Sequence, residues 1–96
     1  MTAGEGPDAA GAARARRELH ALPNIGPKLA EALVEAGIDS VAALREAGAV
    51  AAWWRIHPRF DCLHSLYDLE AALQGIPKRE LDPATRARLR REHDAG

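Results

Sequence analysis

A short turn that enters a helix carries the residues of this sequence best suited to chemistry. Gly26, Lys28 and Leu29 would bring their backbone N–H groups to the start of that helix, where amides lack helical partners and the helix dipole is positive. Pro27 has no N–H, whereas the Lys28 ammonium adds a positive charge. Such donors can hold one phosphate of a nucleic-acid backbone without reading its sequence. The candidate phosphate-binding residues are therefore Asn24, Gly26, Lys28 and Leu29.

The histidines and the single cysteine do not form a recognisable catalytic or metal site. His57, Asp61 and His64 are only loosely grouped and lack the ligand spacing of a zinc site. Cys62 and His64 are two positions apart, so on a helix they cannot face each other as nucleophile and base. We expect Cys62 to be buried as a small hydrophobic residue. The sequence predicts a protein that is not an enzyme, with no metal, cofactor or small-molecule substrate.

Length, composition and charge limit the organisation of the chain and its partners. The 96 residues suffice for one domain, and 47% hydrophobic with 28% charged residues is typical of a globular protein. Residues 1–13 are rich in Ala and Gly, which predicts a flexible tail before a helical domain at 14–93. The net charge of −1 restricts any nucleic-acid contact to a local patch. No membrane-length apolar run or signal peptide is present, so we expect a cytoplasmic protein with no membrane contact.

Two expected helices flank the candidate site. The first begins near Ala12 and ends before Pro23, because the residue preceding a proline is pushed out of the α region. The second begins at Pro27, whose fixed φ suits a first helical position. It ends at Gly37, and Ile38 follows as the hydrophobic partner of a Schellman cap. The two helices should therefore form a hairpin.

Further short helices, and no strands, are expected in the rest of the chain. No segment alternates with a period of two, the pattern of a half-buried strand. The fold class is therefore expected to be all-α, a compact bundle of about five to six short helices of the SAM-like or helix-hairpin-helix type. The later helices and their caps are 41–46 after Asp39 or Ser40 and ended by Gly48, then 49–57, then 62–74 after Asp61, and 83–93 after Asp82.

The turn itself resembles the helix-hairpin-helix consensus, in which Gly, a hydrophobic residue and Gly are followed four residues later by Ala. Ile25, Gly26 and Ala30 match this pattern, and Asn24 replaces the first Gly. Asn tolerates the left-handed backbone region, so the replacement is compatible with the turn. The resemblance implies contact with a DNA backbone, although the same turn also builds structural units and protein-binding modules.

A longer series of landmarks extends from Leu19 to Leu89. It comprises Leu22-Pro23-Asn24-Ile25-Gly26-Pro27-Lys28, Gly37-Ile38, Leu44-Arg45, Gly48-Ala49-Val50, Leu66-Tyr67, the run from Leu69 to Gly75, and Leu81. This series resembles the C-terminal domain of the TfoX/Sxy family, whose members are tied to regulation of natural DNA transformation in bacteria. The resemblance implies an all-α domain with no cofactor and no catalytic residues. It also implies a stand-alone copy, because full-length members carry a preceding α/β domain.

Two classes of partner are left open. One is DNA, bound through its backbone. The other is a protein, either a different chain or a second copy in a homodimer, for which the candidate interface residues are Trp54, Arg86 and Arg90. Adjacent residues cannot share one narrow helix face, so Trp53 is expected to be buried and Trp54 to be partly exposed. Aromatic and arginine side chains are enriched at protein interfaces.

Overall fold

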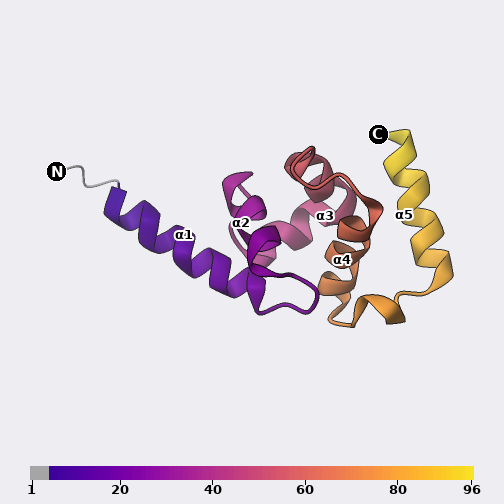
Figure 1. Ribbon diagram of the computed structural model, residues 1–96, viewed down its shortest axis with the longest axis horizontal. Helices are drawn as coiled ribbons and strands as arrows, with labels where there is room; N and C mark the ends of the chain where they lie inside the picture. The colour runs from indigo at the N-terminus through magenta and orange to yellow at the C-terminus, as the bar shows by residue number, and fades with distance from the viewer. Residues whose placement is uncertain (1–4) are drawn as a thin grey trace.

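The described residues form five α-helices and one 3₁₀ helix with their connecting turns, and they contain no strand. The structure, a computed structural model, describes residues 5–96, and it describes side-chain environments from residue 10 onward. Figure 1 shows α1 at one end of the molecule and α5 at the other. The predicted all-α fold is confirmed. The elements are α1 (Glu5–His20), α2 (Pro27–Glu35), α3 (Val41–Ile56), α4 (Leu63–Gln74), η1 (Lys78–Glu80) and α5 (Pro83–Ala95).

The first helix begins earlier than the sequence predicted. Helical structure starts at Glu5 rather than near Ala12, so residues 5–13 of the expected tail are helical. Alanine has the highest helix propensity of all residues, and this stretch contains several alanines. The flexibility expected of residues 1–4 lies outside the described residues. None of the helices in the described part of the chain combines the length and apolarity needed to cross a membrane.

The turn between α1 and α2 follows from three residues with different backbone requirements. Asn24 has a φ of 69°, in the left-handed region that Asn tolerates better than most residues. Ile25 is only 3% exposed and packs into the core between the helices. Gly26 has an extended backbone and caps α2, with Pro27 at the first helical position as predicted. The chain therefore enters α2 with the glycine and proline on the surface.

The end of α2 is the predicted Schellman cap. The N–H of Ile38 donates to the Leu33 carbonyl at 2.8 Å, and the N–H of Gly37 donates to the Val34 carbonyl at 3.0 Å. Gly37 has a φ of 91°, which a residue with a Cβ rarely adopts. Ile38 is 1% exposed, so the cap also directs the chain back into the core.

The third helix is bent where the sequence predicted a break. Ser40 caps it by accepting the Ala43 N–H at 2.9 Å. Gly48 has φ 80° and ψ 163°, so the helical geometry is interrupted there and two helical segments follow one another. The predicted separation of segments 41–46 and 49–57 is thereby confirmed, although the two run on as one bent element.

Two predictions about the start of α4 are wrong. The N-cap position is held by Cys62 and not by Asp61, and the cysteine side chain makes no capping bond. Cys62 is also exposed rather than buried, because it precedes the helix with an extended backbone and does not lie on the buried face of α4. The buried residue at this point is Ser65, which donates to the Cys62 carbonyl at 2.7 Å and accepts from Trp53 Nε1 at 3.3 Å.

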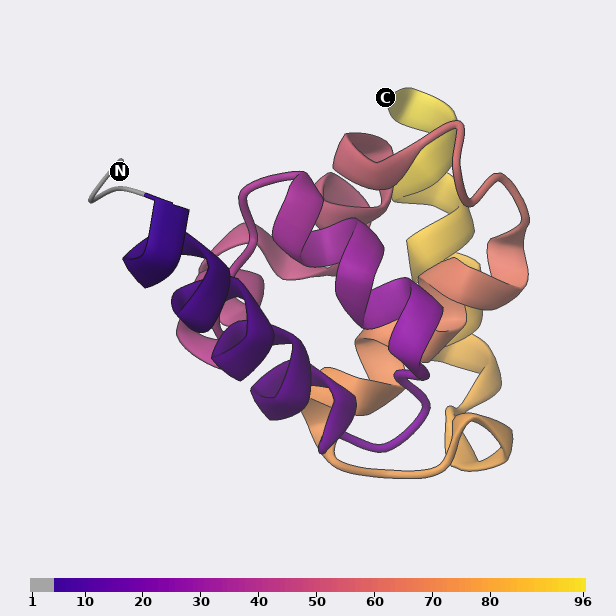
Figure 2. The ribbon, with the colours of Figure 1, turned by 60° about the vertical axis from the view of Figure 1, so that its left-hand side comes forward.

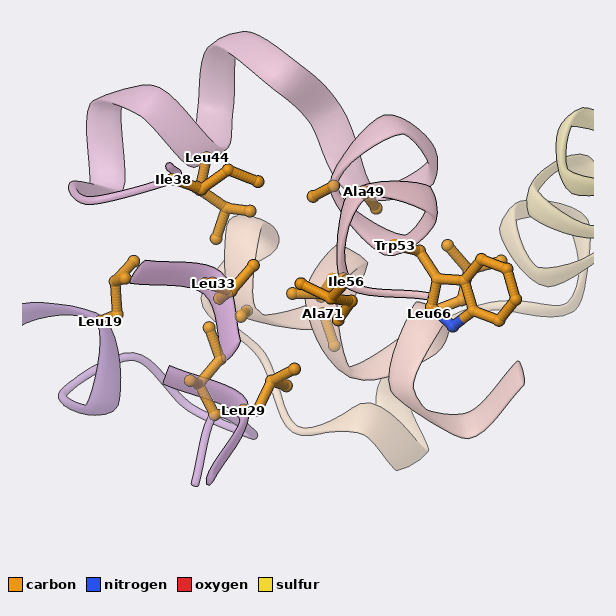
Figure 3. Packing of buried hydrophobic residues seen from close by; sticks show 14 of the residues in the cluster. Leu19, Leu29, Leu33, Ile38, Leu44, Ala49, Trp53, Ile56, Leu66 and Ala71 are labelled. Atoms are coloured by element: carbon orange, nitrogen blue, oxygen red, sulfur yellow. The ribbon is translucent and has the colours of Figure 1, made fainter. Parts of the chain in front are cut away.

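One hydrophobic core joins all five helices. Each helix contributes a leucine that is at most 1% exposed, and each such burial is worth about 1.5–3 kcal/mol. Figure 3 shows the leucines of the first four helices among the buried side chains, with the Trp53 ring at one edge of the group. The helices pack chiefly as two pairs, α1 with α2 and α3 with α4 (Figure 2). The buried leucines include Leu19, Leu33, Leu44, Leu66 and Leu89.

The last helix has the start predicted from Asp82 and Pro83. Asp82 Oδ1 accepts the Thr85 N–H at 2.7 Å, and Pro83 occupies the first helical turn. The hydrogen bond from the Thr85 backbone lowers the pKa of the Asp82 carboxyl below its ordinary value. Leu81 is 4% exposed and packs into the core. These contacts fix the position at which α5 begins.

Candidate phosphate-binding surface

The first turn of α2 presents backbone donors without acceptors. The first helical bond runs from the Ala30 N–H to the Gly26 carbonyl at 3.0 Å, and no side chain caps the helix. Within the described residues, the N–H groups of Gly26, Lys28 and Leu29 have no hydrogen-bond partner. The first turn also contains no acidic side chain. The leucine side chain is 5% exposed, so Leu29 offers only its amide to a ligand.

Asn24 lies at this turn, but its side chain is engaged elsewhere. Its Nδ2 donates to the Ile76 carbonyl at 2.7 Å, and its Oδ1 accepts the Lys78 N–H at 3.0 Å. Both ends of the amide therefore bond to the segment that leads from α4 into η1. The Asn24 side chain thus joins two distant parts of the chain, and its contact with phosphate stays a prediction.

An open groove between α1 and α2 adjoins the exposed amides. The groove, with a volume of about 390 Å³, is called the α1–α2 groove below. Its basic lining residues are Arg16, Arg17 and His20 from α1 and Lys28 from α2. His20 Nδ1 donates to the Ile25 carbonyl at 2.8 Å, which fixes the ring against the turn. Sequence reasoning missed these three α1 residues, although their spacing of three and four positions places them on one helix face.

Acidic side chains near the groove are held by one arginine. Glu31 is the acidic residue of the groove lining, and Glu35 follows one turn later on α2. Arg59, from the segment after α3, bonds Glu31 at 2.8 Å and Glu35 at 2.6 Å. The hydrogen bond with Glu31 raises the pKa of the Arg59 guanidinium, and Glu35 adds to the effect. The arginine thus reduces the negative potential that α2 would otherwise place beside the amides.

A second depression, of about 410 Å³, also has Lys28 in its lining. Phe60 and Leu29 contribute apolar surface to it, and Asp68 is its acidic residue. Asp68 forms an ion pair with Lys78 at 3.2 Å. The carboxylates that line the two depressions are therefore both paired with a cation. The Lys28 ammonium, in contrast, has no ion-pair partner among the described residues.

The two tryptophans occupy different environments, as predicted. Trp53 is 2% exposed and donates from Nε1 to the Cys62 carbonyl at 3.1 Å. Trp54 is 39% exposed. One face of its ring is stacked on His93, with ring centroids 5.1 Å apart and an interplanar angle of 12°. Trp54 thus presents a partly covered aromatic surface at the α5 end of the molecule, far along the chain from the α2 turn.

Arg86 and Arg90, predicted together with Trp54 as protein-interface residues, differ in their contacts. Arg86 donates from Nε to the Leu81 carbonyl at 3.1 Å and from a terminal nitrogen to the Lys78 carbonyl at 2.7 Å. Its guanidinium lies over the Tyr67 ring at 5.0 Å, so it holds α5 against η1 and α4. Arg86 therefore has a structural role within the domain, and its part in an interface stays a prediction. Arg90 is exposed on the same helix.

No metal-binding cluster occurs in the part of the chain that the structure describes. His57, the first member of the loose group noted in the sequence, instead packs beside Trp53 with ring centroids 5.2 Å apart. The titratable side chains around the α2 turn are basic or ion-paired, so the arrangement is suited to binding an anion.

The sequence profile of the TfoX C-terminal domain matches residues 15–93. Two crystal structures of proteins without an assigned function, both from Listeria monocytogenes, resemble the fold. The one in a triclinic form is 38% identical, covering 80% of this chain and 90% of that one, with a TM-score of 0.74. The one in a tetragonal form is 36% identical, covering 83% and 96%, with a TM-score of 0.71. No curated protein matches the chain in sequence.

Proposed function

The chain belongs to the TfoX C-terminal domain family, and we propose that it is a non-enzymatic domain that binds the backbone of DNA weakly and without sequence preference. A regulatory role of the kind that the TfoX/Sxy resemblance implies, in natural DNA transformation, is part of this proposal. Such a domain would act in the cytoplasm, where it meets DNA.

The observation that carries the proposal is the set of donors at the start of α2. Amides of Gly26, Lys28 and Leu29 lack acceptors within the described residues, and the positive end of the α2 dipole coincides with them. The Lys28 ammonium lies on the surface beside these amides. Backbone amides at a helix start bind phosphate regardless of the attached base, so the contact carries no sequence information.

Weak binding follows from the small number of donors. Non-specific affinity grows with the number of phosphates neutralised, and one helix start with one lysine neutralises few. The net charge of −1 gives no long-range attraction to a polyanion. The domain therefore depends on its local surface and not on its overall charge.

A salt titration with a fluorescently labelled DNA duplex tests the proposal. We expect binding at about 50 mM salt that weakens measurably toward about 200 mM, because binding releases counterions from the neutralised phosphates. Unlabelled duplexes of unrelated sequence should compete equally well. The absence of binding at low salt, or affinity that does not depend on salt, would refute backbone binding.

The exposed Trp54 supports a second candidate, a protein-binding module that makes no contact with nucleic acid. Trp54 is the large hydrophobic side chain exposed among the described residues, and the exposed Arg90 lies on the neighbouring helix. Tryptophan and arginine are common hot spots of protein interfaces. Sedimentation at high concentration tests self-association: a concentration-dependent dimer that is lost in Trp54→Ala supports it, and a monomer excludes the homodimer.

A further inference from the structure

The α1–α2 groove lies directly beside the donors at the start of α2. Lys28 belongs to both, since its side chain lines the groove and its amide is in the first turn of α2. Arg16 and Arg17 line the opposite wall. Neither arginine forms an ion pair with a described residue. A chain of phosphates held at the α2 turn therefore meets further cations in the groove.

The balance of charge in the groove favours an anion. Glu31 is the acidic lining residue, and Arg59 binds it at 2.8 Å. A guanidinium that binds carboxylates so closely limits their repulsion of a nearby phosphate. With Arg59 and both of its glutamates included, the groove has more positive than negative side chains. His20 adds a polar ring that the Ile25 carbonyl holds in place.

Resting on the function proposed above, we infer that the α1–α2 groove holds the phosphodiester strand of DNA next to the phosphate at the α2 turn. Arg16 and Arg17 contact the neighbouring phosphates of that strand. Arg59 is a positioning residue that touches no DNA and acts by binding Glu31 and Glu35. The footprint of the domain thus extends along α1, beyond the turn that the sequence motif marks.

The double substitution Arg16→Gln/Arg17→Gln tests this inference in the salt titration. The slope of log affinity against log salt is negative, and each lost phosphate contact reduces its magnitude by about 0.9, so we expect a slope that is shallower by about 1.8. The matched control is Arg14→Gln/Arg90→Gln. It removes the same charge from exposed positions outside the groove and should leave the slope unchanged.

The role of Arg59 is tested separately, by the DNA affinities of two variants. Arg59→Gln should weaken DNA binding, because it releases two carboxylates beside the phosphates. Arg59→Gln/Glu31→Gln should restore part of that affinity, since it removes the carboxylate that lines the groove. Failure of the second variant to recover any affinity would overturn the role assigned to Arg59.

The outcomes separate this inference from the function on which it rests. If the unaltered chain does not bind DNA, both are overturned. If it binds and depends on Lys28, but the Arg16/Arg17 double variant behaves like its control, only the groove assignment fails. Poly-glutamate of equal charge provides a competitor of protein chemistry. If it displaces the duplex from the unaltered chain but not from the Arg16/Arg17 double variant, the groove binds an acidic protein segment, and the inference that it holds a DNA strand is overturned.

Discussion

Replacing Lys28 with glutamate is expected to remove most DNA binding without loss of the fold. The ammonium is exposed, has no ion-pair partner among the described residues, and lies beside the unpaired amides of α2. A hydrogen bond to a charged group is worth about 1.5–3 kcal/mol, so affinity at low salt should fall at least about tenfold. The thermal midpoint should stay the same or rise slightly, because an acidic side chain in the first turn is favourable for the helix dipole.

The matched control for this variant is Arg90→Glu. Both substitutions change the net charge of −1 by the same amount, and Arg90 is also exposed. Fluorescence anisotropy with the labelled duplex should therefore show a small effect for Arg90→Glu and a large one for Lys28→Glu. Equal effects would mean that only overall charge matters, and a larger effect at Arg90 would place the binding surface on α5.

Replacing Asn24 with alanine is expected to have a large effect on stability. The substitution removes the bonds to the Ile76 carbonyl and the Lys78 N–H. It also leaves alanine at a φ of 69°, in the left-handed region. Each of the two lost hydrogen bonds costs about 0.5–1.5 kcal/mol and the backbone about 1–2 kcal/mol, so the free energy of unfolding should decrease by about 2–5 kcal/mol.

Asn24→Gly separates the two causes. Glycine accepts the left-handed backbone without strain, so this variant loses only the hydrogen bonds and should be less destabilised than Asn24→Ala. Urea unfolding of both variants measures the difference. A free energy of unfolding within about 0.5 kcal/mol of the unaltered chain for Asn24→Ala would show that the link to Ile76 and Lys78 contributes little to stability.

Local signals in the sequence predicted much of the fold. Pro27 at the first position of α2, the Ser40 cap and the Asp82 cap depend on residues close together in the chain, and the structure contains all three. The start of α4 was predicted less well, because Asp61 and Cys62 are neighbours and either could precede the helix. The start of α1 was missed because the alanine-rich segment lacks the large apolar residues used to recognise a helix.

The candidate site was only partly predictable. The amides of the α2 turn follow from Gly26 and Pro27 and could be located from the sequence. The bond from Asn24 to Ile76 spans 52 positions, and the bond from Arg59 to Glu31 spans 28. Such contacts depend on tertiary packing, which no local pattern reports. For the same reason Arg86 looked like a surface residue, although it holds α5 in place.

The most direct test of the account is an amide NMR titration of the isotope-labelled chain with duplex DNA at low salt. The phosphate is expected at the start of α2, so the largest amide shifts should occur at Gly26, Lys28 and Leu29. Smaller shifts should follow along α1 at Arg16 and Arg17, and all should be reversed by added salt. Shifts centred on Trp54 and α5, or no shifts at any salt concentration, would contradict the account.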